Sequence, residues 1–370
     1  MFICLSPGGQ SLTVGEAPKE KLLVGTVDGI FSFLKRNGAW QHQGTLIPGK
    51  HVSSIIFEPT SQTLFAGAYS CEIFASADLG KTWERRDQGI GEREIFSLAS
   101  QLVGGRPRVY AGTQPAHLFY SDDLGKSWTE LPGLRQVPGV DKWTFPGPPH
   151  QAHTKSITFH PNDPNIIHVA VEVGGFLRST DGGKTWSVVS GVNPDAHRVL
   201  IPTSDPTRVY GTAPTTNCGP EVAAGFCVSA DGGETWKSLT PRDFRIGYVD
   251  PFFVHPNKPD LLFVGGAKTG PGTWRNLHTA DARMARSRDG GKTWDILNGG
   301  LPEHIRANIE GMAMDVWNGG FALFAGTTDG DIFYSQDEGE HWETIIKGIG
   351  PVSKSHHYQN LALEGQQAHH

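Results

Sequence analysis

The stretch 179–186 reads STDGGKTW, and this octet decides the fold because versions of it recur along the chain. Six copies keep Ser first, Asp third, Gly fifth and Trp last, with the Trp residues 45 to 58 positions apart. A degraded seventh copy, FLKRNGAW at 33–40, retains only the Trp. The other full copies are SADLGKTW (76–83), SDDLGKSW (121–128), SADGGETW (229–236), SRDGGKTW (287–294) and SQDEGEHW (335–342).

Each octet has the chemistry of a β-hairpin turn. Asp accepts hydrogen bonds from nearby backbone N–H groups, and Gly adopts the positive φ that a tight turn requires. An alternating segment precedes the Ser, and the Trp begins the returning strand. Upstream lies a second strand pair, as in SITFHPNDPNIIHVAV (156–171). Each period therefore holds four strands, and four-stranded units that repeat every 40–60 residues or so are typical of propeller blades.

Composition supports an all-β chain. Glycine accounts for 47 of 370 residues and proline for 25, which disfavours long helices. We predict a seven-bladed β-propeller of four-stranded antiparallel blades, formed as a single domain over residues 1–370. Blade 1 is expected to take its second to fourth strands from about 21–44, and blades 2–7 from about 51–348. The segment HYQNLALE (357–364) is expected to be the inner strand of blade 1, closing the ring without a free sheet edge.

The octet resembles the Asp-box, or BNR repeat, of sialidases, sortilin-type receptors, xyloglucanases and photosystem II assembly factors. The likeness covers roughly residues 21–365, and its motif S-x-D-x-G-x-x-W implies propeller hairpins. It implies no single activity, because those families do different things. The Asp residues of the octets belong to turns on the outer rim, so we interpret them as structural.

Charge and hydropathy exclude some partners. The net charge is −6 and no basic run stands out, so nucleic-acid binding lacks an electrostatic basis. No apolar run reaches 18 residues, and the start MFICLSPGG lacks the basic and apolar regions of a secretion signal. We expect a cytoplasmic protein with no membrane span. A secreted form with its signal removed would look the same, and a Cys218–Cys227 bridge and the oligomeric state stay open.

The mouth of the central channel is the expected site. Inner strands line a propeller channel, and their first residues gather imidazoles and carboxylates from separate blades. His51, His153, His197 and His357 are the candidate ligands of a divalent metal, because neutral imidazole and carboxylate groups suit such an ion. The candidate catalytic residues in the same positions are Glu94, Tyr248, Asp250 and Glu310. The alternative is that each His has a structural role and caps a turn.

Three function classes remain open. The first is an enzyme in which a metal and carboxylates assist hydrolysis or elimination on a small polar or sugar-like substrate. The second is a glycosidase of the sialidase-like type, although the Arg-Ile-Pro signature of sialidases is absent and they have six blades. The third is a non-catalytic scaffold that binds a ligand or assists assembly. Long insertions at 132–152, 213–226 and 267–285 carry aromatic residues and are expected to wall the mouth.

Overall fold

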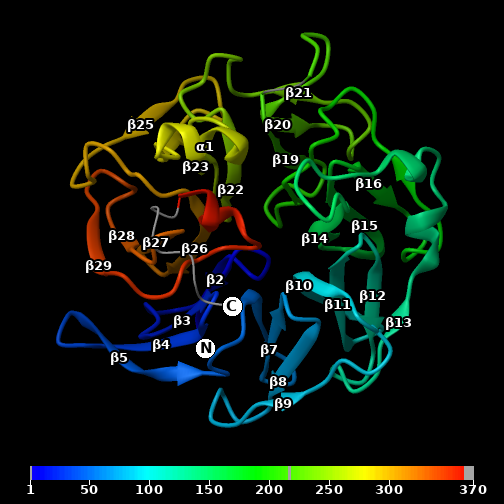
Figure 1. Cartoon of the computed structure of the whole chain (residues 1–370), viewed down its shortest axis with the longest axis horizontal. Coiled ribbons are helices and arrows are strands. Elements are labelled where there is room, and N and C mark those ends of the chain that lie inside the picture. The colour runs from blue at the N-terminus through cyan, green and yellow to red at the C-terminus, as the bar shows by residue number, and fades with distance from the viewer. Residues whose placement is uncertain (1, 216–217, 362–370) are drawn as a thin grey trace.

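The computed structural model describes residues 2–215 and 218–361. Seven sheets surround a central axis, and the chain runs round the ring in sequence order (Figure 1). The predicted seven-bladed propeller of four-stranded blades is therefore confirmed. From the axis outward, the blades run β1-β3-β4-β5, β6-β7-β8-β9, β10-β11-β12-β13, β14-β15-β16-β17, β18-β19-β20-β21, β22-β23-β24-β25 and β26-β27-β28-β29.

In blades 2 to 6 the outer strand is the shortest of the four, with two or three residues. The inner strands are β1 (Ile3–Leu5), β6 (Val52–Glu58), β10 (Glu94–Val103), β14 (His153–His160), β18 (Arg198–Leu200), β22 (Tyr248–His255) and β26 (Ile309–Trp317). The second strands are β3 (Lys21–Thr26), β7 (Thr63–Ala68), β11 (Arg106–Gln114), β15 (Asp163–Glu172), β19 (Val209–Ala213), β23 (Lys258–Ala267) and β27 (Gly320–Thr327).

The third strands are β4 (Gly29–Arg36), β8 (Glu72–Ser76), β12 (Leu118–Ser121), β16 (Gly175–Ser179), β20 (Gly225–Ser229), β24 (Arg283–Ser287) and β28 (Ile332–Ser335). The outer strands are β5 (Ala39–Leu46), β9 (Glu84–Arg85), β13 (Thr129–Glu130), β17 (Ser187–Val188), β21 (Lys237–Ser238), β25 (Asp295–Leu297) and β29 (Glu343–Ile346). The helical elements are η1 (Pro132–Gln136), η2 (Val140–Lys142), α1 (Pro271–Leu277) and η3 (His357–Leu361).

The octets form the turns that their sequence predicts. In the copy at 179–186, Ser179 donates to Asp181 (2.9 Å) and accepts from the Gly183 amide (2.9 Å). The carboxylate of Asp181 accepts from the amide and hydroxyl of Thr185 at 2.9 and 2.7 Å. These bonds lower the pKa of Asp181 to about 2. The side chain of Trp186 closes the turn by donating to the Gly183 carbonyl (3.0 Å).

Ring closure differs from the prediction. The inner strand of blade 1 is the N-terminal β1, which pairs parallel to β3 with Ile3 opposite Leu22. Residues 357–361 form the 3-10 helix η3, and the rest of the expected closing strand, 362–364, lies outside the described residues. The expectation of a C-terminal closing strand was therefore wrong. The sequence carries no hairpin signal for this pairing, because β1 has only three residues and its parallel partner β3 begins at Lys21.

The segment after β1 crosses the channel, and we call Ser6–Val14 the N-terminal strap. The Gly8 amide donates to the Ser53 carbonyl (2.8 Å), and the Gly8 carbonyl accepts from the Leu98 amide (3.1 Å). The strap ends in β2 (Leu12–Val14), which adds to the inner edge of β26 in parallel. A Cβ on Gly8 would lie 1.8 Å from the Phe96 carbonyl oxygen, so only glycine fits there.

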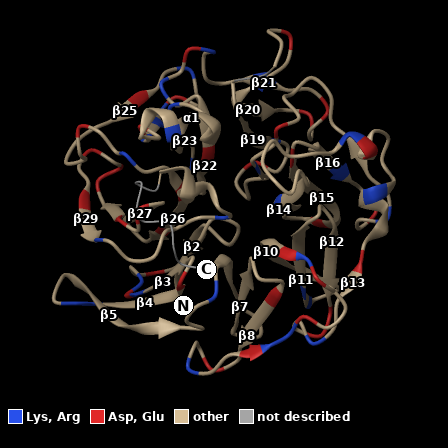
Figure 2. Cartoon of the chain, viewed as in Figure 1, with Lys and Arg blue, Asp and Glu red and all other residues tan. Residues whose placement is uncertain are grey.

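Other sequence expectations concern the surface and the thiols. Cys218 and Cys227 are free thiols in the structure. Basic and acidic residues are interspersed along the ribbon round the ring (Figure 2). In the described part of the chain, every helix is too short or too polar to cross a bilayer.

Candidate functional site

The inner strands bring charged side chains together inside the channel, on the side where these strands begin, which we call the mouth face. Six side chains form this channel cluster, and three of them are basic and three acidic. The structure buries the carboxylates of Asp250 and Glu310 completely. The members of the channel cluster are Lys155, Glu172, Arg198, Asp250, Glu310 and Lys354.

Glu172 stands at the end of β15 and contacts side chains from blades 4, 5 and 6. Its Oε2 lies 2.9 Å from the Lys155 ammonium and accepts a hydrogen bond from His153 Nε2 (2.9 Å). Its Oε1 accepts from the Tyr248 hydroxyl (3.3 Å) and lies 3.5 Å from His197 Nε2. Glu172 therefore orients both imidazoles and the phenol that sequence analysis selected.

Asp250 is shared among three cations. Its Oδ2 lies 3.0 Å from Lys155 Nζ and 2.5 Å from Lys354 Nζ. Its Oδ1 accepts from Arg198 Nε at 2.7 Å. Because the carboxylate is engaged on both oxygens, it has no free oxygen with which to attack or deprotonate a substrate.

Glu310 is held by the C-terminal segment. Its Oε2 accepts from the Ser353 hydroxyl (3.0 Å) and the Lys354 amide (3.1 Å). Its Oε1 accepts from the Asn308 amide (3.3 Å) and lies 3.3 Å from His357 Nδ1. The carboxylate thus anchors the chain that follows β29 to the inner strand β26.

The protonation states follow from these contacts. Burial alone raises the pKa of Glu172 and Asp250, but the ammonium groups of Lys155 and Lys354 outweigh it and hold both well below their usual range. Burial also raises the pKa of Glu310, but the nearby His357 imidazole and Lys354 ammonium outweigh it and lower this pKa to about 2. All three carboxyls are ionised at neutral pH. A general acid of a glycosidase needs a raised pKa, which none of them has.

Burial shifts the pKa values of Lys155 and Tyr248 toward their neutral forms. Burial lowers the pKa of Lys155 to about 8, despite the nearby Asp250 and Glu172. Burial, reinforced by the charge of Glu172, raises the pKa of Tyr248 well above its usual range. Tyr248 is therefore a neutral hydrogen-bond donor to Glu172.

The C-terminal segment covers the channel cluster. Ser353 and Lys354 are buried, and Leu361 of η3 packs with Tyr248 and Trp274. In Figure 1 this red segment lies over the inner strands beside α1. Tyr248, Asp250 and Glu310 lie at the starts of inner strands, as sequence analysis placed them, but they are buried. The segment over them is one that sequence analysis expected within blade 1.

The four candidate histidine ligands do not meet at one point. His51 Nε2 contacts the Ser353 carbonyl (2.7 Å), whereas His153 and His357 contact Glu172 and Glu310 respectively. His197 Nδ1 donates to the Val249 carbonyl at 2.6 Å, which directs Nε2 toward Glu172. Burial lowers the pKa of His51 to about 4 and also lowers the pKa of His153, so both are neutral near pH 7.

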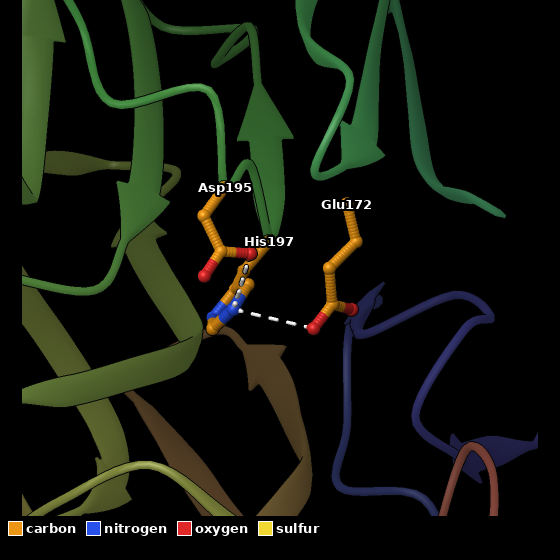
Figure 3. Close-up of side chains that lie close together, drawn as sticks. All are labelled: Glu172, Asp195 and His197. Atoms are coloured by element: carbon orange, nitrogen blue, oxygen red, sulfur yellow. Dashed lines mark ion pairs between the residues drawn. The ribbon is translucent and has the colours of Figure 1, made fainter. Parts of the chain in front are cut away.

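One set of metal-type donors does converge among the described residues. Donor atoms of Glu172, Asp195 and His197 all lie within 4.8 Å of one another. Figure 3 shows the His197 imidazole between the two carboxylates, with Nε2 at 3.5 Å from Glu172 and 3.6 Å from Asp195. His197 Nε2 and Asp195 Oδ1 are buried, and neither atom has a hydrogen-bond partner among the described residues. Sequence analysis selected His197 and left the two carboxylates unassigned.

A second group of polar and aromatic residues reaches solvent on the mouth face. We call His51, Tyr69, Glu94, His356 and Tyr358 the mouth patch; His356 is exposed and the others are half-buried. His51 stacks on Tyr69 with ring centroids 5.2 Å apart, and His356 meets Tyr69 edge-on at 4.9 Å. Tyr69 also meets Phe96 edge-on at 5.5 Å, and Phe96 is two residues from Glu94 along β10. Burial and the charge of Glu94 raise the pKa of Tyr69 to about 12.

The insertions contribute less to an aromatic wall than expected. Trp274 of α1 is fully buried against Tyr248, and Trp143 packs partly into the core of blade 4. Phe145 is half-buried, stacking on His357 at 6.1 Å and meeting His153 edge-on at 5.1 Å. The insertion 132–152 therefore reaches the two histidines that lie against Glu172 and Glu310, with Phe145 as its contact. Part of the insertion 213–226 lies outside the described residues.

The octet repeat is similar to the Asp-box repeat of known proteins. A family model for the BNR/Asp-box repeat matches residues 177–188. The oligoxyloglucan-reducing end-specific xyloglucanase of Emericella nidulans is 27% identical over 201 residues, which is 51% of this chain and 23% of that protein. The chain spans 23% and 24% of the length of the curated relatives it matches, both xyloglucanases.

Solved structures agree on the fold. The GH74 xyloglucanase of Xanthomonas campestris superposes with a TM-score of 0.66 at 17% identity, covering 94% of this chain and 56% of that one. YCF48 bound to D1 peptide superposes with a TM-score of 0.51 at 14% identity, covering 90% and 88%. At these identities the likenesses show the fold alone.

Proposed function

We propose that this chain is a carbohydrate-binding propeller of the glycosidase-like type, with its saccharide on the mouth patch. The observation that carries the proposal is the half-exposed aromatic group His51, Tyr69 and Tyr358 beside the carboxylate of Glu94. Flat aromatic faces next to a few polar groups suit a sugar, which presents apolar C–H faces and a rim of hydroxyls. The xyloglucanase relatives favour a saccharide over other small ligands.

Glu94 is the carboxylate best placed for chemistry on such a ligand. It begins β10, remains half-buried, and carries no ion pair among the described residues. Asp250 and Glu310 are fully buried, ionised and paired, so we assign them to holding the blades and the C-terminal segment together. Hydrolysis at the mouth patch would therefore use Glu94 as its acid or base.

Saccharide binding tests the proposal directly. Purified protein is run through gels containing xyloglucan or another β-glucan, and its retardation is compared with that of Tyr69→Ala. Loss of one stacking face should weaken binding roughly 5- to 10-fold. Tyr120→Ala is the matched control, because Tyr120 on β12 is also half-buried but lies outside the mouth patch. Retardation by no polysaccharide, or equal retardation of Tyr69→Ala, would contradict the proposal.

Release of reducing ends tests the role of Glu94. Glu94→Gln keeps the size of the side chain and removes its proton chemistry, so turnover should fall roughly 100-fold or more while binding persists. Undiminished turnover would remove Glu94 from the mechanism. Binding without turnover in the unaltered protein would leave a saccharide-binding scaffold, the third class that the sequence allows.

A metal-assisted hydrolase or lyase is the second candidate, and the convergence of Glu172, Asp195 and His197 favours it (Figure 3). One imidazole and two carboxylates are a common donor set for divalent transition metals. Ligand atoms that each lie about 2.1 Å from an ion are about 3.0–3.4 Å apart, so the separations of 3.5 and 3.6 Å need little contraction. An ion held there would polarise a substrate oxygen or a water.

Elemental analysis separates this candidate from the first. After incubation with Zn²⁺ or Mn²⁺ and gel filtration, the protein should retain about one ion per chain, and His197→Ala should retain none. His153→Ala is the matched control, because His153 contacts Glu172 from outside the donor set. A metal-free wild-type protein would refute the metal site and leave the mouth-patch proposal untouched.

A further inference from the structure

The channel contains a cavity of about 410 Å³ beyond the channel cluster, on the side away from the mouth face. Its wall comes from inner strands of several blades and from the N-terminal strap, which contributes Gly9, Gln10 and Ser11. The volume falls within the range of small-molecule pockets. Because the strap crosses the channel and pairs with β26, the cavity is a shaped pocket within the channel.

Apolar rings and polar groups both line the cavity. The rings of Phe57, Phe159 and Phe252 contribute to the wall, which would cover the hydrocarbon body of a ligand. Ser11 and Ser100 also line it, and their hydroxyls have no hydrogen-bond partner among the described residues. Such a combination orients a small ligand through few polar contacts while most of its surface is buried.

Among the described residues that line the cavity, Arg198 of the channel cluster is the charged one. Its Nε donates to Asp250 Oδ1 (2.7 Å) and its Nη2 donates to the Glu310 carbonyl (3.2 Å). Within the described residues, Nη1 has no hydrogen-bond partner. The guanidinium is therefore fixed by two bonds and still has donors to offer.

Arg198 shares its carboxylate partner with two lysines. Asp250 is also in contact with Lys155 and Lys354, at 3.0 and 2.5 Å, and both lysines also contact Glu172. The other guanidinium donors of Arg198 therefore remain available to a ligand. A guanidinium that is held rigidly and keeps free donors forms strong charge-assisted hydrogen bonds with carboxylates.

We infer that the channel cavity binds a small organic anion, a carboxylate with an aromatic or aliphatic body, whose charged end pairs with Arg198. The body lies among Phe57, Phe159 and Phe252, and the far face of the propeller is the route of entry. This site is separate from the mouth patch, from which the channel cluster divides it. It therefore does not depend on the proposed saccharide function.

Ligand-observed NMR and calorimetry on the full chain test the inference with four probes. Phenylacetate and octanoate are compared with phenylacetamide and octanamide, which match them in shape but carry no charge. Wild-type protein should bind at least one carboxylate saturably and its amide roughly 10-fold more weakly, the difference expected for a charge-assisted bond. Arg198→Gln should bring the acid and the amide to similar affinities.

A cavity-filling variant locates the binding. Ala99 and Ser100 on β10 both line the cavity and are half-buried. Ala99→Phe should abolish binding of acid and amide alike, with Ser100→Trp as the substitute if that variant fails to fold, as judged by its melting curve. Three outcomes would overturn the inference: no saturable binding of either carboxylate, equal binding of acid and amide by the wild type, or undiminished binding after the cavity is filled.

Discussion

Replacing Lys354 by Met should show how strongly the channel cluster holds the ring together. Lys354 follows the last blade and places its ammonium 2.5 Å from Asp250 and 3.8 Å from Glu172. Methionine fills a similar volume without the charge. Two buried carboxylates then lose one of their cations, with Lys155 and Arg198 left to balance them.

Removing one partner from a buried ion pair costs about 3–5 kcal/mol. With an unfolding entropy of about 2.1 cal/mol/K per residue, a 370-residue chain loses about 4–6 °C of melting temperature for that cost. The matched control is Lys258→Met, whose ammonium lies 2.6 Å from Glu338 but is 56% exposed. An exposed pair contributes about 1 kcal/mol or less, so the control should melt within about 1 °C of the wild type.

The loss of melting temperature in Lys354→Met should depend on pH, because Lys354 lowers the pKa of Asp250. Asp250 has a folded pKa well below its ordinary value of 3.8, so it stabilises the fold above that pH and loses this contribution as pH falls through the folded pKa. Without Lys354 the depression is smaller, and the gap between variant and wild type should narrow below about pH 4. Melting curves by circular dichroism from pH 3 to 7 measure this. Equal melting at pH 7, or a gap that does not change with pH, would refute the reasoning.

Two further variants test the frame of the propeller. Trp342→Ala should lower the free energy of unfolding by about 3–5 kcal/mol, because Trp342 is 1% exposed. Trp186 is half-buried, so Trp186→Ala should lower it less. Denaturant titration measures both, and equal losses would mean that the burial of the Trp does not set the stability of each octet. Gly8→Ala should lower the free energy of unfolding by about 1–3 kcal/mol or more, since its Cβ would overlap the Phe96 carbonyl. The control is Gly272→Ala in α1, whose Cβ meets open space, so its effect on stability should be neutral or slightly favourable. A wild-type melt for Gly8→Ala would show that the N-terminal strap does not pack as described.

The repeat was sufficient to predict the ring, because its signal is local. Each octet encodes its own turn through hydrogen bonds within five residues, as between Ser179, Asp181 and Gly183, so the blades could be counted from the sequence. The closing strand could not be found in this way. β1 has three residues and pairs with β3 in parallel, and no turn motif joins them.

The site was predicted in part for a similar reason. Alignment of the inner strands located Tyr248, Asp250, Glu310 and three of the histidines around the channel, because the position of a residue in its strand sets its height along the axis. Their burial was not predictable, since it depends on where the segment after β29 goes. Glu172 and Lys354 were missed. A signal for Glu172 existed, as a carboxylate that ends the apolar run VAV at 169–171.

The two chain termini give the two faces of the channel different chemistry. The C-terminal segment covers the channel cluster with Ser353 and Lys354, so a ligand on the mouth face meets the mouth patch first. The N-terminal strap narrows the channel beyond the cluster and shapes a cavity in which Arg198 is the charged group. Because the cluster separates the faces, Tyr69→Ala should leave carboxylate binding unchanged and Ala99→Phe should leave saccharide binding unchanged. If each variant impaired both ligands, a single continuous site through the channel would replace the two separate ones.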